Sequence, residues 1–486
     1  MNKISCFLPY AGKEQVEKTV NSLQATGLIE EIRLITTDAT LESLPDCEIL
    51  FVDMPYSSAT LKAIANAAKG EYTLLYTKET TLEMGMFALE RMIHILEDSS
   101  AGMVYADHYQ IADGKQSNAP VIDYQFGSLR DDFNFGSLLL FNTEKLKEAA
   151  GHMKSDYNFA GLYDLRLKLS QHSNLVHINE YLYSEVENDT RKSGEKIFDY
   201  VDPKNRDRQI EMEQACTEHL KEIGGYLAPE FKKIEFSAGN FEYEASVIIP
   251  VRNRIRTIRD AIKSVLMQKT DFKYNLIIID NHSTDGTTEA IDELQADERL
   301  IHIVPERNDL GIGGCWNVGV HHPKCGKFAV QLDSDDVYKD ENTLAIMVRA
   351  FYEQNCAMVV GTYMMTDFNM NMIAPGIIDH KEWTPANGRN NALRINGLGA
   401  PRAFYTPVLR EVKVPNTSYG EDYALGLNFS RQYQIGRVYD VVYLCRRWDD
   451  NSDASLDIVK MNGHNLYKDR IRTWELQARI AMNKNK

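Results

Sequence analysis

Three aspartates follow an apolar run in the second half of the chain, within the sequence Asp333-Ser334-Asp335-Asp336. The preceding residues, 327–332, have the composition of a buried strand, so the acids stand just past its end. Mg²⁺ and Mn²⁺ prefer oxygen ligands and commonly bridge protein carboxylates to substrate phosphates. Taken alone, such a turn is more often a solvated loop. In context it predicts a divalent-metal site that handles a phosphorylated compound.

The elements around this turn follow a repeating order. Residues 245–251 form an apolar run, a helical pattern follows, and residues 276–280 form a second apolar run. Strands that alternate with helices indicate βαβ units and a mainly parallel sheet. Ligands of open α/β sheets bind beyond the carboxyl ends of the strands. We therefore expect Asp280 and Asp333, each at such an end, to face one crevice.

The N-terminal half repeats this order with different chemistry. Residues 4–9 resemble residues 245–250, and residues 70–76 match residues 326–332 without a gap. At the end of that strand the first half has Thr77-Lys78-Glu79-Thr80, and a lysine there would repel a divalent cation. In the same alignment Thr36 replaces Asp280 and Tyr163 replaces Glu421. The sequence thus predicts a duplication whose first copy keeps the strands and loses the acids.

These patterns predict an α/β protein with two tandem domains. We expect a first domain at residues 1–187, a charged helical connector at 188–240, and a catalytic domain with a C-terminal helix at 241–486. The connector helix is expected over 202–222, with Asp202 as its cap and Pro203 in its first turn.

Composition excludes several classes of function. A net charge of −16 over 486 residues disfavours binding to nucleic acid or to anionic lipid. Seven cysteines without a C-x-x-C pair indicate reduced thiols. The N-terminus has too short an apolar stretch for a signal peptide, and no run approaches the ~20 apolar residues of a membrane span. We expect a cytoplasmic protein, with a peripheral location at the inner membrane face as the alternative.

Three motifs occur in the order and spacing of a known family. The sequences at 247–253, 280–287 and 333–336 together resemble family 2 glycosyltransferases of the GT-A fold. The resemblance covers residues 245–450 well, whereas residues 1–186 resemble the family only as a degenerate copy. It implies two Rossmann-like domains of the nucleotide-diphospho-sugar transferase type.

The resemblance also implies roles for individual residues. Asp335 matches the principal metal ligand, with Asp333 and Asp336 beside it, and His464 falls where some relatives place a further ligand. An ordinary surface or capping role is the alternative for His464, as helix capping is for Asp280. The residues implied in donor binding are Pro250, Arg252, Asn253, Asp280, Asn308, Gly311, Asn317, Asp333 and Ser334.

A second acidic pair, Glu421-Asp422, resembles the family's catalytic pair. Its aspartate would deprotonate the acceptor hydroxyl, so Asp422 is the expected base and Glu421 the second choice. A capping pair at the start of a helix is the alternative. Displacement of a nucleoside diphosphate requires a metal station and a base, and these two acidic groups would supply them.

The sequence therefore predicts a Mn²⁺- or Mg²⁺-dependent, inverting glycosyltransferase. Its donor would be a nucleotide-diphosphate sugar, with UDP favoured, and its acceptor a hydroxyl of a saccharide or glycolipid intermediate. One alternative is a bifunctional enzyme with two active domains. Another is a non-catalytic scaffold that binds nucleotide sugar or carbohydrate. The donor sugar, the acceptor, the anomer, the role of the first copy and self-association into a homo-oligomer are left open.

Overall fold

The computed structural model describes residues 3–10, 12–42, 44–187, 205–237, 239–381, 383–448 and 456–485. The described chain divides into two compact units, each considered by itself below. Unit 1 comprises residues 3–187, 205–226 and 456–474, and unit 2 comprises residues 227–448 and 475–485.

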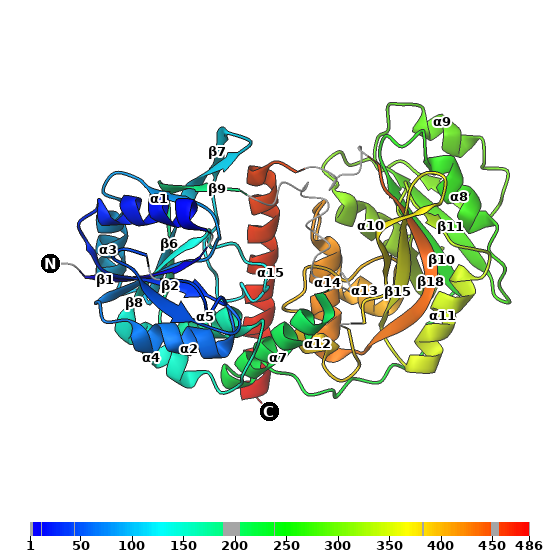
Figure 1. Cartoon of the computed structure of the whole chain (residues 1–486). Helices are drawn as coiled ribbons and strands as arrows, with labels where there is room; N and C mark the ends of the chain where they lie inside the picture. The colour runs from blue at the N-terminus through cyan, green and yellow to red at the C-terminus, as the bar shows by residue number, and fades with distance from the viewer. Residues whose placement is uncertain are drawn as a thin grey trace. The chain divides into compact units, whose positions relative to one another are not determined.

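Unit 1 is an α/β structure around a sheet of nine strands, in the order β3-β2-β1-β4-β8-β6-β9-β5 with β7 paired to β6 (Figure 1). Its elements are β1 (Ile4–Pro9), α1 (Lys13–Gln24), β2 (Ile29–Thr36), β3 (Glu48–Phe51), α2 (Ser58–Ala67), β4 (Tyr72–Tyr76), β5 (Leu82–Met84), α3 (Ala88–Asp98), β6 (Met103–Ala112), β7 (Lys115–Ala119), β8 (Leu138–Asn142), α4 (Thr143–His152), α5 (Gly161–His172), β9 (Leu175–Val186) and α7 (Arg206–Glu222).

Helices cover both faces of this sheet because its strands are apolar on both sides. In β1, Cys6 and Leu8 pack with α1 and α3, whereas Phe7 packs on the opposite face with α2, α4 and α5. This alternation follows from the period of two residues in a strand. The two faces carry separate hydrophobic cores, which fix the strand ends in space.

Unit 2 has the same topology, β12-β11-β10-β13-β17-β15-β18-β14 with β16 paired to β15. Its elements are β10 (Ala245–Val251), α8 (Ile258–Leu266), β11 (Tyr274–Asp280), α9 (Thr287–Asp292), β12 (Leu300–Ile303), α10 (Ile312–His321), β13 (Phe328–Gln331), β14 (Val337–Tyr338), α11 (Thr343–Gln354), β15 (Met358–Thr366), β16 (Met372–Ile378), α12 (Gly388–Asn391), β17 (Arg402–Tyr405), α13 (Thr406–Val412), α14 (Glu421–Gln432) and β18 (Ile435–Arg446), followed by α15 (Ile458–Lys484).

The shared strand order confirms the predicted pair of α/β domains. Both sheets are mixed rather than mainly parallel. The first four paired strands of each are parallel, but β8 and β17 run antiparallel to both of their neighbours. The alternation of apolar runs with helices does not reveal these strands, since β8 follows a long loop and β17 follows a segment whose helix α12 has only four residues.

Two helices are assigned to the units differently from the domain limits expected above. Helix α7, expected in a connector, belongs to unit 1, and Asp202 and Pro203 lie outside the described residues. Helix α15 contributes residues up to Trp474 to unit 1 and residues from Glu475 to unit 2.

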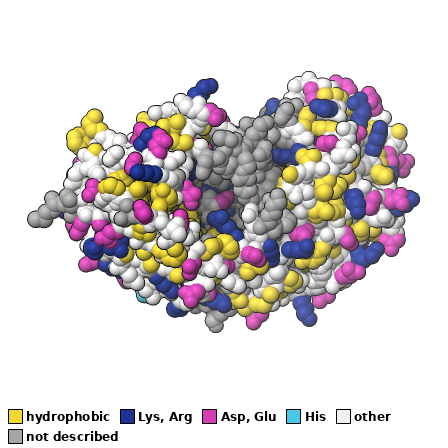
Figure 2. All heavy atoms as spheres, viewed as in Figure 1, with side chains coloured by type: hydrophobic (Ala, Val, Ile, Leu, Met, Phe, Trp, Pro, Cys, Tyr) yellow, Lys and Arg dark blue, Asp and Glu magenta, His cyan; other side chains and the backbone are white. Residues whose placement is uncertain are grey.

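Charged side chains of both signs are interspersed over the visible surface (Figure 2). Within the described ranges, no helix combines the length and the apolar character needed to cross a bilayer. All seven cysteines are free thiols, and six of them are buried.

Candidate functional site

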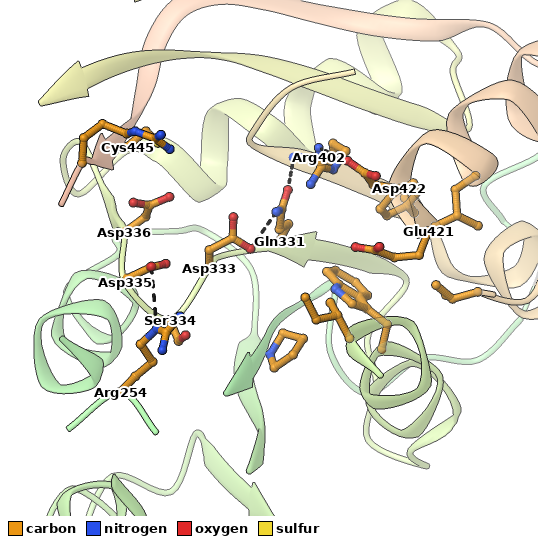
Figure 3. A pocket seen from close by; sticks show the side chains of 17 residues that line it. Arg254, Gln331, Asp333, Ser334, Asp335, Asp336, Arg402, Glu421, Asp422 and Cys445 are labelled. Carbon is orange, nitrogen blue, oxygen red and sulfur yellow. Dashed lines mark hydrogen bonds and ion pairs between the residues drawn. The ribbon is translucent and has the colours of Figure 1, made fainter. Parts of the chain in front are cut away.

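A cavity of about 300 Å³ lies at the carboxyl end of β13 in unit 2 (Figure 3). It brings together both acidic groups that the sequence analysis singled out, the turn after β13 and the start of α14. The predicted site residues that line it are Pro250, Asp333, Ser334, Asp335, Asp336, Glu421 and Asp422. Residues that line it without having been assigned a role include Arg254, Trp316, Gln331, Arg402, Cys445 and Arg447.

The acidic turn is held by the strands on either side of it. The Asp333 amide donates to the Tyr443 hydroxyl at 3.2 Å, and the Asp333 carboxylate accepts from Gln331 Nε2 at 2.9 Å. Asp336 is buried, and its Oδ1 accepts from the Arg446 amide at 2.8 Å. Asp335 Oδ2 lies 3.7 Å from Arg254 Nε. The three carboxylates therefore have different immediate partners.

Among the described residues, no three His, Cys, Asp or Glu side chains form a group that could hold a metal ion by themselves. The predicted four-residue ligand set is therefore not assembled. Mg²⁺ sites in phosphate-handling enzymes often use one or two carboxylates and complete their shell with phosphate and water. Asp335 and Asp333 fit that smaller donor set, whereas Asp336 is engaged with the backbone of β18.

Electrostatics at the turn favour a cation. Burial raises the pKa of Asp333, which Arg402 opposes and Asp335 reinforces. Burial followed by repulsion from Asp335 and Asp333 raises the pKa of Asp336 well above its usual range. A positive ion beside this turn would relieve the repulsion between these carboxylates.

The second acidic group lies at the first turn of α14. Gly420, at φ 79°, adopts the left-handed conformation that starts this helix and directs Glu421 and Asp422 into the cavity. Burial, then repulsion from Asp422, raises the pKa of Glu421 to about 8. Asp422 Oδ2 instead forms an ion pair with Arg402 Nη1 at 2.9 Å. At neutral pH the pair therefore offers one protonated and one cation-bound carboxyl group.

Gln331 and Arg402 join the two acidic groups (Figure 3). Gln331 donates to Asp333, and its Oε1 accepts from the Arg402 amide at 3.2 Å. Burial alone would lower the pKa of Arg402, but Asp422, Asp333 and Glu421 raise it. The result is a continuous polar network across the floor of the cavity.

Two predicted donor residues organise the neighbouring loops. Asn253, at φ 54°, bridges the segments after β10 and β11, since its amide donates to Ser283 and its Oδ1 accepts from the Thr284 amide. Asp280 is 0 % exposed and accepts from Ser283 and Thr288. Burial alone would raise the pKa of Asp280, but His302 at 3.6 Å, followed by the hydrogen bonds from Ser283 and Thr288, lowers it. Helix α9 starts at Thr287 after Gly286 and has no side-chain cap bond, so capping by Asp280 is not observed, and its contact with a donor stays a prediction.

The remaining predicted residues do not line the cavity. Arg252 and Asn308 are exposed on loops, and Gly311 precedes α10. Asn317 exchanges hydrogen bonds with the backbone of Val414. His464 belongs to the part of α15 assigned to unit 1, and its predicted ligation of the metal stays a prediction.

Two residues that the sequence reasoning did not assign carry much of the site's geometry. Gln331 could have been noticed, because it is the polar residue in the otherwise apolar strand β13. Arg254 had no such signal, since it follows Asn253 in an ordinary polar loop. The pairing of Arg402 with Asp422 is visible only in the structure.

The structure also corrects one alignment between the copies. Helices α5 and α14 have equal length, and Ser170 and Ser430 bond alike to the carbonyls of Leu167 and Leu427. Gly161 and Leu162 therefore correspond to Glu421 and Asp422. The expected correspondence of Tyr163 with Glu421 was wrong by two residues.

The part of the chain that contains the acidic turn is similar to known proteins. Residues 246–403 match the family described as "Glycosyl transferase family 2". An uncharacterized glycosyltransferase of Rickettsia felis is 36 % identical over 198 residues, covering 40 % of this chain and 31 % of that protein. The GalNAc(5)-diNAcBac-PP-undecaprenol beta-1,3-glucosyltransferase of Campylobacter jejuni is 36 % identical over 93 residues, covering 19 % and 29 %. The chain thus spans less than a third of the length of either relative.

Among solved structures, TarS 1-349 of S. aureus in complex with UDP-GlcNAc is similar with a TM-score of 0.37 and 19 % identity. The match covers 49 % of this chain and 72 % of that one. The family match includes β10, the acidic turn and Arg402. The C-terminal half of the chain therefore contains a glycosyltransferase domain of family 2.

Proposed function

We propose that unit 2 transfers a sugar from a nucleotide-diphosphate sugar to a hydroxyl group, with inversion and with the help of Mn²⁺ or Mg²⁺. The observation that carries this proposal is that two separate acidic groups, at Asp333/Asp335 and at Glu421/Asp422, face one cavity of about 300 Å³. The chemistry needs two such groups, one for the leaving diphosphate and one for the acceptor.

Each group has a distinct task in this proposal. Asp335, with Asp333, would hold the metal, which supplies Lewis-acid stabilisation of the leaving diphosphate when bound. Arg254, beside Asp335, is placed to contact the same phosphates. Asp422 would accept the proton of the acceptor hydroxyl once the hydroxyl displaces its contact with Arg402.

The acceptor is proposed to be a saccharide, free or carried by a lipid. The Campylobacter jejuni relative is named as a glucosyltransferase for a saccharide linked to undecaprenol diphosphate, which supports this class. A UDP-sugar remains the favoured donor on the family resemblance.

A thermal-shift screen of UDP-, GDP- and dTDP-sugars, each with and without Mn²⁺, tests the proposal. A ligand at 100 times its Kd stabilises the folded state by about 2.7 kcal/mol, which corresponds to several degrees. We expect one nucleotide class to raise the melting temperature only together with the metal. Proton NMR of the product then gives its anomeric configuration. Absence of both stabilisation and donor hydrolysis across the panel would favour the binding scaffold instead.

A further inference from the structure

Unit 1 has a cavity of about 290 Å³ whose position in the fold corresponds to that of the site in unit 2. It is lined by Thr77 after β4 and by Leu162 in α5, and these residues correspond to Asp333 and Asp422. The first copy has thus lost the acids of the active site while retaining a hollow of similar size. A retained cavity with new side chains indicates a retained ligand site with new chemistry.

The new lining is aromatic. Tyr56, Phe133, Phe135, Phe159 and Tyr163 all face this cavity. Phe133 and Phe135 pack against each other with ring centroids 4.5 Å apart, which makes this wall rigid. Phe159 is 39 % exposed and offers its ring to a ligand. The electron-rich face of an aromatic ring attracts the weakly positive C–H bonds of a sugar ring, so such a lining suits a pyranose.

The lining also includes cations. Arg166 is only 6 % exposed, and its guanidinium donates to the carbonyls of Ser128 and Arg130 and stacks 4.7 Å from the Tyr163 ring centroid. No described carboxylate forms an ion pair with Arg166. Buried charges are normally paired with an opposite charge, and the printed hydrogen bonds of Arg166 go to neutral carbonyls, so an anionic ligand would supply the missing partner.

Two further charged side chains line this cavity. Arg208, exposed on α7, lines the same cavity and adds a second cation. Asp131 is the acidic residue of the lining and can accept hydrogen bonds from sugar hydroxyls. Together these groups fit a sugar that carries a negative charge.

A nucleotide fits this cavity poorly. None of the residues that line it comes from the end of β1, whereas the corresponding end of β10 and the loop after it contribute Pro250 and Arg254 to the cavity of unit 2. Lys78, which corresponds to Ser334, is paired with Glu185 and with Glu187 at 3.3 Å, so a metal diphosphate has no place there. The cavity therefore covers the acceptor side of the fold and omits its nucleotide side.

A second cavity adjoins the first and extends it beyond the size of one sugar ring. A second cavity in unit 1, of about 400 Å³, shares Met54 and Asn158 with the first. Phe51, 52 % exposed, lines this extension. The two cavities together could hold more than one residue of a chain.

From these observations we infer that unit 1 binds an acidic saccharide, whose sugar ring stacks on Phe159 and whose carboxylate or phosphate lies between Arg166 and Arg208. Binding itself is independent of the transfer activity. The further role of this site in holding the growing acceptor glycan rests on the function proposed for unit 2.

Ligand-detected NMR and calorimetry on the full chain test this inference, with glucuronic acid, glucose 6-phosphate, glucose and UDP as probes. We expect one or both anionic sugars to bind at least about tenfold more tightly than glucose, because a charge-assisted hydrogen bond contributes at this level. UDP should not compete. Preference for glucuronic acid assigns a carboxylate ligand, and preference for glucose 6-phosphate assigns a phosphate ligand.

Two exposed side chains locate the site, and variants of both should fold. Arg208→Ala should abolish the preference for the anionic sugar, and Phe159→Ala should weaken all sugars about tenfold. Asp335→Ala, in unit 2, should leave sugar binding unchanged even if transfer is lost, which separates this inference from the proposed function. Equal binding of glucose and the anionic sugars, competition by UDP, or unchanged binding in both unit 1 variants would overturn it.

Discussion

The two units share one fold but differ in the side chains at the carboxyl ends of their strands. In unit 2, four polar residues are connected by hydrogen bonds and an ion pair at this edge of the sheet, and Glu421 lines the same cavity. In unit 1 the corresponding positions hold small, apolar or neutral residues. By strand register and helix length, Gln331, Asp333, Arg402, Glu421 and Asp422 correspond to Leu75, Thr77, Leu139, Gly161 and Leu162.

This difference shows that the network is not required by the fold. A buried charge is tolerated only with its partners, so removal of one member leaves the others desolvated and unpaired. Loss of Arg402, for example, would leave Asp422 and Asp333 without the cation that they share. The two copies differ at all five positions, which agrees with this dependence of the residues on one another.

The charges of the turn and of the strand beside it are distributed differently in the two units. Unit 2 has acids on the turn, with Cys445 in β18 and Arg447 just after it. Unit 1 has Lys78 on the turn, with Glu185 in β9 and Glu187 just after it. An ion pair within the protein occupies the place where unit 2 is proposed to hold a metal.

The largest effect is expected from Asp335→Ala. Loss of the metal station should lower transfer about 10⁴-fold, since Lewis-acid stabilisation contributes several kcal/mol to the transition state. The matched control is Glu79→Ala at the corresponding turn of unit 1, which should leave the rate unchanged. Product analysis by mass spectrometry also tests the bifunctional alternative: a second linkage that persists in Asp335→Ala and is lost in Glu79→Ala would show that both units transfer sugar.

Asp422→Asn should lower kcat about 10³-fold by removal of the general base, with donor binding retained. Glu421→Gln should cost far less, because Glu421 is protonated at neutral pH in its raised-pKa environment. Steady-state kinetics with a saturating donor measure both. If Glu421→Gln proved the more damaging change, the roles of the two residues would have to be exchanged.

Arg402→Leu introduces the residue that unit 1 has at this position. We expect a loss of about 30-fold in kcat/KM, because Asp422 and Asp333 lose a shared partner. The acidic limb of the pH–rate profile should also move to higher pH, since loss of the cation raises the pKa of nearby carboxyl groups. Arg402→Lys should recover part of both effects. An unchanged pH profile would restrict Arg402 to a structural role.

The smallest effect concerns stability. Folding favours the protonated form of Glu421, whose pKa rises from its ordinary 4.5 to about 8. The free energy of unfolding therefore falls as pH rises from about 4.5 to 8, because the unfolded chain releases the Glu421 proton that the folded chain retains. This fall is the penalty of burying Glu421. Glu421→Gln removes this penalty and should raise the melting temperature by about 3 °C at pH 8 and by almost nothing at pH 5. Equal melting temperatures at pH 8 would contradict the raised pKa.

The strand ends and the acidic turn could be predicted from sequence because short apolar runs bounded by turn residues are a strong local signal. The Arg402–Asp422 pair could not, since its two residues lie on different elements that only the sheet brings together. The error at Tyr163 has a similar origin. Sequence matching paired Asp164 with Asp422, whereas the helix register pairs Tyr163 with Tyr423, and each of these tyrosines donates to a loop carbonyl.

Helix α15 has a consequence for the order in which the protein can mature during synthesis. In unit 1, Asp469 is fully buried and bonds to Ser128 and Arg130; in unit 2, Arg479 is fully buried and bonds to Ser430. Domains generally fold on the ribosome from the N-terminus onward. Unit 1 cannot do so completely, because one of its core partners is translated almost three hundred residues after β9. Both units must wait for the same late helix, so stalled or truncated chains should expose the hydrophobic surfaces of both to chaperones and proteases.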